Sequence, residues 1–167
     1  MIYVGSFSKS IFPGLRLGYL VGPQPFIREA RALRASVLRH PPGHIQRTAA
    51  YFLSLGHYDS LIRKMGQVFA HRRETLERAL EDHGLGIEGR GVFGGSSIWM
   101  RAPDGVDTEE LDQRLKRQSV LIEPGRPFFN RADPPRNFYR LAYSSISRDR
   151  IPDGVGRLAR EIEAMGR

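Results

Sequence analysis

Residues 6–19 read Ser-Phe-Ser-Lys-Ser-Ile-Phe-Pro-Gly-Leu-Arg-Leu-Gly-Tyr, the stretch that says most about the fold. It places Lys9 at the end of an expected strand, among small hydroxyl residues, and Arg16 follows after one tight turn. No acidic residue lies nearby in the sequence to neutralise either cation. Hydroxyl and guanidinium groups donate hydrogen bonds to oxygen and therefore suit a phosphate. A partly desolvated lysine beside other positive charge favours its neutral, nucleophilic form. The stretch therefore indicates a phosphate site with a reactive lysine, the two features that pyridoxal phosphate requires.

Two other motifs share parts of this stretch. Ser-x-x-Lys occurs in penicillin-binding proteins and β-lactamases, but the Ser-Asp-Asn and Lys-Thr-Gly strings that those enzymes also need are absent from the sequence. A P-loop that ended at Lys9-Ser10 would need glycine where Ser8 and Tyr3 stand. A surface lysine in a serine-rich turn would explain Ser-x-x-Lys alone, and only the combined string outweighs that explanation.

The combined string resembles the cofactor-lysine segment of class I and II aminotransferases of fold type I, which depend on pyridoxal 5′-phosphate (PLP). It is most similar to the aminotransferase-like domain of MocR-type regulators, a branch of the GntR family. The resemblance implies that Lys9 is the catalytic lysine that forms the Schiff base with PLP. It also implies that Ser6 and Arg16 bind the cofactor phosphate, with assistance from Ser8.

A second resemblance involves residues 138–143, Phe-Tyr-Arg-Leu-Ala-Tyr, which are similar to a late strand of the same family. Its arginine binds the substrate α-carboxylate, which a planar guanidinium can hold through two hydrogen bonds. Strand alternation puts Arg140 on the face opposite Tyr139, Leu141 and Tyr143. Taken alone, Arg140 would be an ordinary edge-strand arginine. With the first motif, the resemblance implies that Arg140 is the carboxylate ligand.

Hydrophobic periodicity predicts alternating strands and helices over the rest of the chain. Strands are expected at 2–7, 16–21, 87–88, 97–100, 120–122 and 138–143, and helices at 25–39, 44–55 and 58–83, with a break at residues 41–43 and a cap at Gly84. Further helices are expected from Asp107 and from Ser147, the expected cap of the last helix. Trp99, after Gly94-Gly95, is expected in the core. Gly125 and Phe128 resemble the loop before the substrate arginine.

The expected fold class is α/β: part of the PLP-transferase large-domain sheet plus the C-terminal small α/β domain, joined by a long helix. The expected domains are residues 1–56, a remnant of the PLP-binding large domain, residues 57–84, the connecting helix, and residues 85–167, the small domain. Since the family's large domain begins well before its lysine, we expect this chain to be an incomplete C-terminal portion that is inactive alone.

Composition excludes several functions. The chain has no cysteine, so disulfides and thiolate metal sites are excluded, and its five histidines show no metal-ligand spacing with carboxylates. No apolar run is long enough for a membrane span and no signal peptide is evident, so a cytoplasmic location is expected. The formal net charge is +8, but the basic residues are scattered along the sequence, which favours solvated arginines over a nucleic-acid surface.

The resemblance implies a PLP-dependent aminotransferase that transfers an amino group between an amino acid and a 2-oxo acid, and that forms a homodimer. The alternative is the effector-sensing and PLP-sensing domain of a MocR-type transcriptional regulator. In that case DNA would be bound only through an N-terminal domain absent from this chain.

Overall fold

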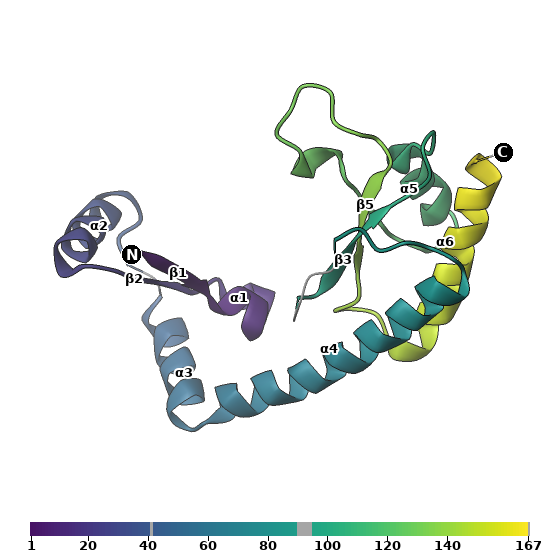
Figure 1. Ribbon diagram of the computed structural model, residues 1–167. Helices are drawn as coiled ribbons and strands as arrows, with labels where there is room; N and C mark the ends of the chain where they lie inside the picture. Colours follow the sequence, from purple (N-terminus) through teal and green to yellow (C-terminus); the bar gives the residue numbers. More distant parts are fainter. Residues whose placement is uncertain (41, 90–94, 167) are drawn as a thin grey trace. The chain divides into compact units, whose positions relative to one another are not determined.

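The structure, a computed structural model, describes residues 1–40, 42–89 and 95–166 (Figure 1). Contacts within the chain divide it into two compact units, unit 1 (Met1–Met65) and unit 2 (Gly66–Arg167). The boundary falls inside the long helix α4 (His57–Asp82), so this helix contributes residues to both units. The three-part domain division expected from the sequence stays a prediction.

Unit 1 begins with a two-stranded antiparallel sheet. Strand β1 (Tyr3–Ser6) pairs with β2 (Gly18–Val21), and the register sets Ser6 opposite Gly18. Between the strands lie a four-residue helix, α1 (Phe7–Ser10), and a 3-10 turn, η1 (Pro13–Leu15). A Cβ atom on Gly18 would stand 2.8 Å from the carbonyl oxygen of Gly5, so the close strand pairing at this point requires glycine. Both predicted strands are confirmed, each somewhat shorter than expected.

Two helices complete unit 1. They are α2 (Gln24–Val37) and α3 (Gly43–Ser54), close to the predicted ranges, and Pro42 stands at the start of α3. Pro41, the first residue of the predicted break, lies outside the described residues. Only Leu15 and Ala49 are buried hydrophobic residues in the described part of unit 1. The unit therefore has almost no core of its own.

Helix α4 confirms the longest predicted helix. It ends where the sequence places its cap: Gly84 has φ +66°, and the Leu85 amide donates to the Leu80 carbonyl at 2.9 Å. This left-handed residue with a hydrogen bond back across the last turn satisfies carbonyls that the helix end would leave free. Leu76, Leu80 and their neighbours on this end of α4 are buried in the core of unit 2.

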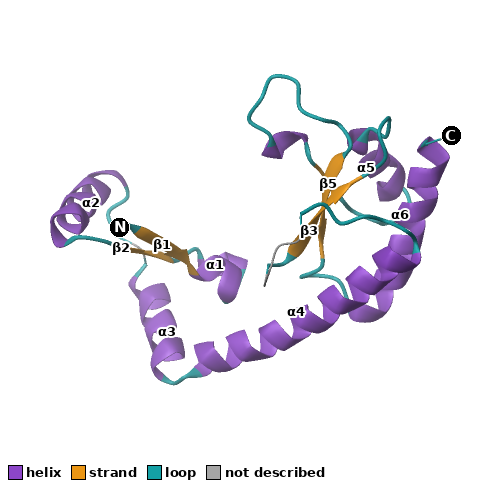
Figure 2. Cartoon of the chain, in the orientation of Figure 1, coloured by secondary structure: helices purple, strands orange, loops and turns teal. Residues whose placement is uncertain are grey.

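Unit 2 is a three-stranded antiparallel sheet with helices on one face (Figure 2). The sheet order is β3 (Ser97–Arg101), β5 (Phe138–Ala142) and β4 (Glu123–Pro124), and the helices are α5 (Thr108–Lys116) and α6 (Ile151–Met165). The side chain of Asp107 caps α5 by accepting from the Glu109 amide at 2.9 Å. The core combines alternate strand residues with the inner helix faces, and its most buried members are Leu80, Met100, Val106, Leu111, Leu115, Tyr139 and Leu158.

The strand predicted at residues 120–122 is wrong, because these residues serve the end of α5. Ser119 has φ +60°, and the Val120 amide donates to the Leu115 carbonyl at 3.0 Å, which closes the helix with a left-handed cap. Strand pairing starts only at Glu123, which lies opposite Arg140. The apolar run therefore marks a helix exit, with Ile122 buried, and the strand follows it.

Two further expectations are corrected. Trp99 does not lie in the core: it is half-buried on the opposite face of the sheet, because the alternation of β3 turns Ile98 and Met100 inward.

Ser147 does not cap the last helix with its side chain. Its carbonyl accepts from the Arg150 amide at 3.2 Å and opens a 3-10 turn, η3 (Arg148–Arg150), from which α6 continues. Gly94, expected in the turn before Trp99, lies outside the described residues.

Candidate functional site

Lys9 lies in helix α1, directly after β1. Its side chain is exposed, and Ser8 beside it is half-buried. Ser6 stands at the N-cap position of α1, yet its hydroxyl makes no capping hydrogen bond. The hydroxyl of Ser10 is buried and has no hydrogen-bond partner among the described residues. The segment therefore has an exposed amine and hydroxyl groups that the fold itself does not use.

Arg16 is brought back to this segment by the strand pairing. It ends η1 in a left-handed conformation, φ +47°, and is exposed. The next residue, Leu17, accepts a hydrogen bond from the Phe7 amide at 2.9 Å, and Ser6 pairs with Gly18. Ser6 and Arg16 are ten positions apart in sequence, but the register places Arg16 only two residues before the partner of Ser6. The structure thus brings Ser6, Ser8, Lys9 and Arg16 together within unit 1.

The net positive charge of the chain is concentrated in unit 1. This unit contains nine lysine and arginine residues and two acidic residues, Glu29 and Asp59, which leaves +7 of the formal net charge of +8. Every ion pair recorded among the described residues lies in unit 2, so the cations of unit 1 are not neutralised internally. The basic residues themselves are spread over both units, as the sequence indicates, and the difference comes from the acidic residues, sixteen of which lie in unit 2. The net positive charge makes unit 1 suit an anionic ligand.

Aromatic rings lie beside the Lys9 segment, and the sequence analysis missed them. Tyr19 on β2 lies 5.1 Å from Phe7 and 5.9 Å from Tyr3, measured between ring centroids, and Phe7 meets Tyr58 edge-on at 6.0 Å. A hydrogen bond with Tyr3 raises the pKa of the Tyr19 phenol. Strand alternation was the available signal for this cluster, because the antiparallel pairing brings Tyr3 and Tyr19 onto one side.

Arg140 lies in unit 2, in the central strand β5. As predicted, it occupies the sheet face opposite the buried Tyr139 and Leu141. Its Nη2 lies 2.5 Å from Oε2 of Glu123, and its guanidinium carbon lies 5.1 Å from the centre of the Phe128 ring. Its Nε is buried and has no hydrogen-bond partner among the described residues. Glu123 as a partner was not foreseen, since the strand containing it was misplaced in the sequence analysis.

An aromatic cluster covers this face of the sheet. Trp99 stacks on Phe138 at 5.9 Å and meets Phe128 at 5.5 Å and Phe129 at 5.9 Å, all measured between ring centroids. Phe128 is 53% exposed, so the cluster presents apolar surface beside the Arg140 guanidinium. The arrangement combines a cation with aromatic rings, which suits a carboxylate that carries an apolar group.

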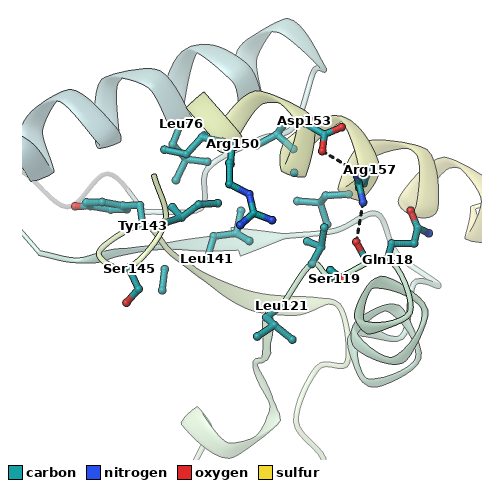
Figure 3. A pocket seen from close by; sticks show the side chains of 17 residues that line it. Leu76, Gln118, Ser119, Leu121, Leu141, Tyr143, Ser145, Arg150, Asp153 and Arg157 are labelled. Atoms are coloured by element: carbon teal, nitrogen blue, oxygen red, sulfur yellow. Dashed lines mark hydrogen bonds and ion pairs between the residues drawn. The ribbon is translucent and has the colours of Figure 1, made fainter. Parts of the chain in front are cut away.

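Unit 2 also contains a separate pocket of about 420 Å³ beside the first turn of α6 (Figure 3). Arg150 extends into it, and Arg157 at its rim is held by Asp153 and by the Gln118 carbonyl, each at 2.8 Å. Much of the remaining lining is apolar, including Leu121 and Leu141. None of the site residues expected from the sequence lines this pocket.

Within the described residues, no group of three or more His, Asp or Glu side chains is arranged to hold a metal ion. None of the described helices is long and apolar enough to cross a membrane.

Comparison with known proteins identifies relatives over nearly the whole chain. The model of the family "Aminotransferase class I and II" matches residues 1–158. The chain is 62% identical over 162 residues to the HTH-type transcriptional regulator TauR of Rhodobacter capsulatus, a match that covers 97% of this chain and 34% of that protein. It is 30% identical to aromatic-amino-acid aminotransferase 1 of Thermococcus litoralis, covering 98% of this chain and 39% of the enzyme.

A solved structure gives the same result for the fold. The α-aminoadipate aminotransferase LysN of Thermus thermophilus, in complex with N-(5′-phosphopyridoxyl)-L-leucine, superimposes with a TM-score of 0.87 at 28% identity. The superposition covers 98% of this chain and 42% of LysN. The predicted α/β fold class is confirmed, as is the resemblance to these aminotransferases and to regulators related to them. The chain spans more than a third but less than half of the length of each of these relatives.

Proposed function

The chain belongs to the class I and II aminotransferase family, and from this premise we propose that it supplies the lysine-bearing part of a PLP-dependent aminotransferase. Lys9 is the residue proposed to hold the cofactor covalently. The observation that supports this role is the segment from Ser6 to Arg16, where an exposed amine, unused hydroxyls and a guanidinium come together without an acidic neighbour.

The residues present fit a phosphate ester. The Ser6 hydroxyl makes no capping bond, and the Ser10 hydroxyl is buried without a recorded partner, so neither is committed to the fold. Arg16 adds a planar donor that suits phosphate oxygens. We assign the phosphate to Ser6 and Arg16, with Ser8 assisting, and the surplus positive charge of unit 1 favours the same anion.

The proposed chemistry gives each side chain one task. PLP supplies the electron sink that lets a proton leave the α-carbon of an amino acid. The Lys9 amine, once released from the cofactor, removes a proton from that carbon and returns it as general base and acid. Arg140 holds the substrate carboxylate. The substrates proposed are an amino acid and a 2-oxo acid, and we propose a homodimer in the cytoplasm.

A second candidate function is supported by one observation. The relative with 62% identity is a transcriptional regulator, and the match covers 97% of this chain. In this proposal the same residues bind cofactor and an amino-acid effector, and DNA is bound by a domain outside these 167 residues. The two functions differ in turnover: a sensor binds its effector without converting it to 2-oxo acid in repeated cycles.

The test uses a polypeptide that contains this chain within the full length that its relatives have. After incubation with PLP and reduction with borohydride, peptide mass spectrometry is expected to find the pyridoxyl group on Lys9. Attachment at Lys64 or Lys116 instead would refute the assignment. Lys9→Ala should lose the label, whereas Lys64→Ala, a matched control in the same unit, should keep it. Repeated formation of 2-oxo acid then separates the enzyme from the sensor.

A further inference from the structure

We propose that Glu123 is a built-in competing anion for Arg140, so that a ligand carboxylate must displace Glu123 before Arg140 can hold it with two hydrogen bonds. The inference rests on the proposed function, since it takes Arg140 to be the carboxylate ligand. Glu123 is then a positioning residue that acts through Arg140 and sets how strongly a carboxylate binds.

The backbone fixes Glu123 beside Arg140. The two residues are direct cross-strand partners in the β4–β5 ladder, and their side chains meet with Glu123 Oε2 2.5 Å from Arg140 Nη2. Gly125, two residues after Glu123, donates its amide to the Phe138 carbonyl at 2.7 Å. A Cβ atom on Gly125 would lie 2.5 Å from that carbonyl oxygen, so only glycine permits this approach. The strand register therefore holds the carboxylate at this place.

The contact occupies the nitrogen that a carboxylate ligand needs. A guanidinium offers two forks for a carboxylate, one formed by Nε with Nη2 and one by Nη1 with Nη2. Nη2 belongs to both, so the Glu123 carboxylate, 2.5 Å from Nη2, competes for a nitrogen that either fork needs. Nε of Arg140 is buried and has no hydrogen-bond partner among the described residues, so a ligand from solvent is left with the fork formed by Nη1 and Nη2. Glu123 also cancels the charge that would attract a second carboxylate.

The surroundings identify the class of ligand. Arg101 and Arg131 lie over Phe138 and Phe129 at the edges of the aromatic cluster, 5.7 and 5.9 Å from the ring centres. Glu123 is the one acidic side chain recorded in contact with Arg140 in the described part of the chain. Removal of its charge leaves a cationic site walled by Phe128 and Trp99. The ligand class is a carboxylate with an apolar or aromatic side group.

The test is a titration of the full chain with 3-phenylpropionate, followed by tryptophan fluorescence. Trp99 is the only tryptophan, and its ring lies 5.5 Å from Phe128, the ring beneath Arg140. Glu123→Gln keeps the size of the side chain and removes its charge. We expect the dissociation constant to fall about threefold, a modest change because both side chains are partly exposed. Glu123→Ala should bind at least as tightly as the wild type.

Two control variants separate the possible failures. Glu109→Gln removes a comparable exposed ion pair, with Arg126 at 3.7 Å, and should leave the dissociation constant unchanged. Arg140→Gln should weaken binding. Unchanged, weaker or absent binding by Glu123→Gln overturns the inference, as does an equal gain by Glu109→Gln. If Arg140→Gln binds like the wild type, the proposed role of Arg140 fails as well, which distinguishes the two failures. A purely structural role for Glu123 predicts no gain of affinity.

Discussion

At the scale of single residues, Arg16 combines an unusual backbone conformation with a proposed ligand role. Its φ of +47° lies in the left-handed region, which costs a residue with a side chain about 1–2 kcal/mol and glycine very little. Backbone strain is often found at functional sites, and here it coincides with the segment that holds Lys9. Substitution at this position can therefore separate binding from folding.

We predict that Arg16→Gly lowers affinity for PLP while stability stays constant or increases. Loss of the guanidinium removes charge-assisted hydrogen bonds to phosphate, and we expect about a tenfold weaker dissociation constant. Relief of backbone strain should increase the free energy of unfolding by up to about 1 kcal/mol. Absorbance titration and urea unfolding measure the two effects in the polypeptide of the relatives' length. A decrease in both the affinity for PLP and the free energy of unfolding would mean that Arg16 has a structural role.

Tyr139 supports a second prediction at this scale. Its hydroxyl is buried without a hydrogen-bond partner among the described residues, and burial raises the pKa of the phenol. Tyr139→Phe should increase the free energy of unfolding by about 1 kcal/mol at neutral pH, because an unsatisfied buried hydroxyl is removed. Urea unfolding of the full chain measures this change in the free energy of unfolding. Tyr143→Phe is the contrasting variant: it removes a hydroxyl that donates to the Gly95 carbonyl at 2.9 Å, and should destabilise.

The same phenol gives a pH dependence. The unfolded chain releases the tyrosine proton near pH 10, whereas the folded chain retains it to higher pH, so the stabilising contribution is present below pH 10 and declines above it. The wild type should therefore lose stability faster than Tyr139→Phe as pH rises beyond about 10. Parallel unfolding curves for the two proteins over that range would contradict the assigned cause.

At the scale of elements, two glycines, one inside helix α4 and one just after its end, have opposite expected behaviour. Gly84 follows the helix with φ +66°, and no atom lies within 4 Å of a Cβ placed there, so Gly84→Ala should cost about 1 kcal/mol through backbone strain alone. Gly66 lies within the helix, also with free space, so Gly66→Ala should stabilise by about 0.5–1 kcal/mol. Thermal unfolding of both variants provides the check, and changes of the same sign would contradict it.

Local patterns predicted most elements, and the errors arose where a residue's partner is far away in sequence. The periodicity and Gly84 gave the limits of α4 to within a residue or so. Residues 120–122 were predicted to be a strand because they form a short apolar run, and such a run occurs both in strands and directly after a helix cap. That error also concealed Glu123 as the partner of Arg140, since cross-strand register cannot be read from one strand. Trp99 was placed in the core by its size, although alternation with Ile98 and Met100 points it outward.

At the scale of the whole molecule, the relatives are more than twice as long as this chain. We predict that residues 1–167 alone bind PLP weakly and transfer no amino group, because the chain spans less than half of the length of the relatives that it matches. The remaining phosphate contacts lie in unit 1, so this weak binding should decrease further as salt is added. Titration followed by cofactor absorbance tests this. A tight, salt-independent, stoichiometric complex that reacts with amino acids would contradict it.

The near absence of buried residues in unit 1 has a consequence for amide hydrogen exchange. Local opening requires little free energy where few apolar groups are buried, and exchange there is fast. In this chain the amides of β1, β2, α2 and α3 should exchange early, and those of β3 and β5 late. Helix α4 contains both environments, since its buried residues begin only at Leu76. A single continuous helix should therefore show two exchange rates, with protection increasing toward its C-terminal turns.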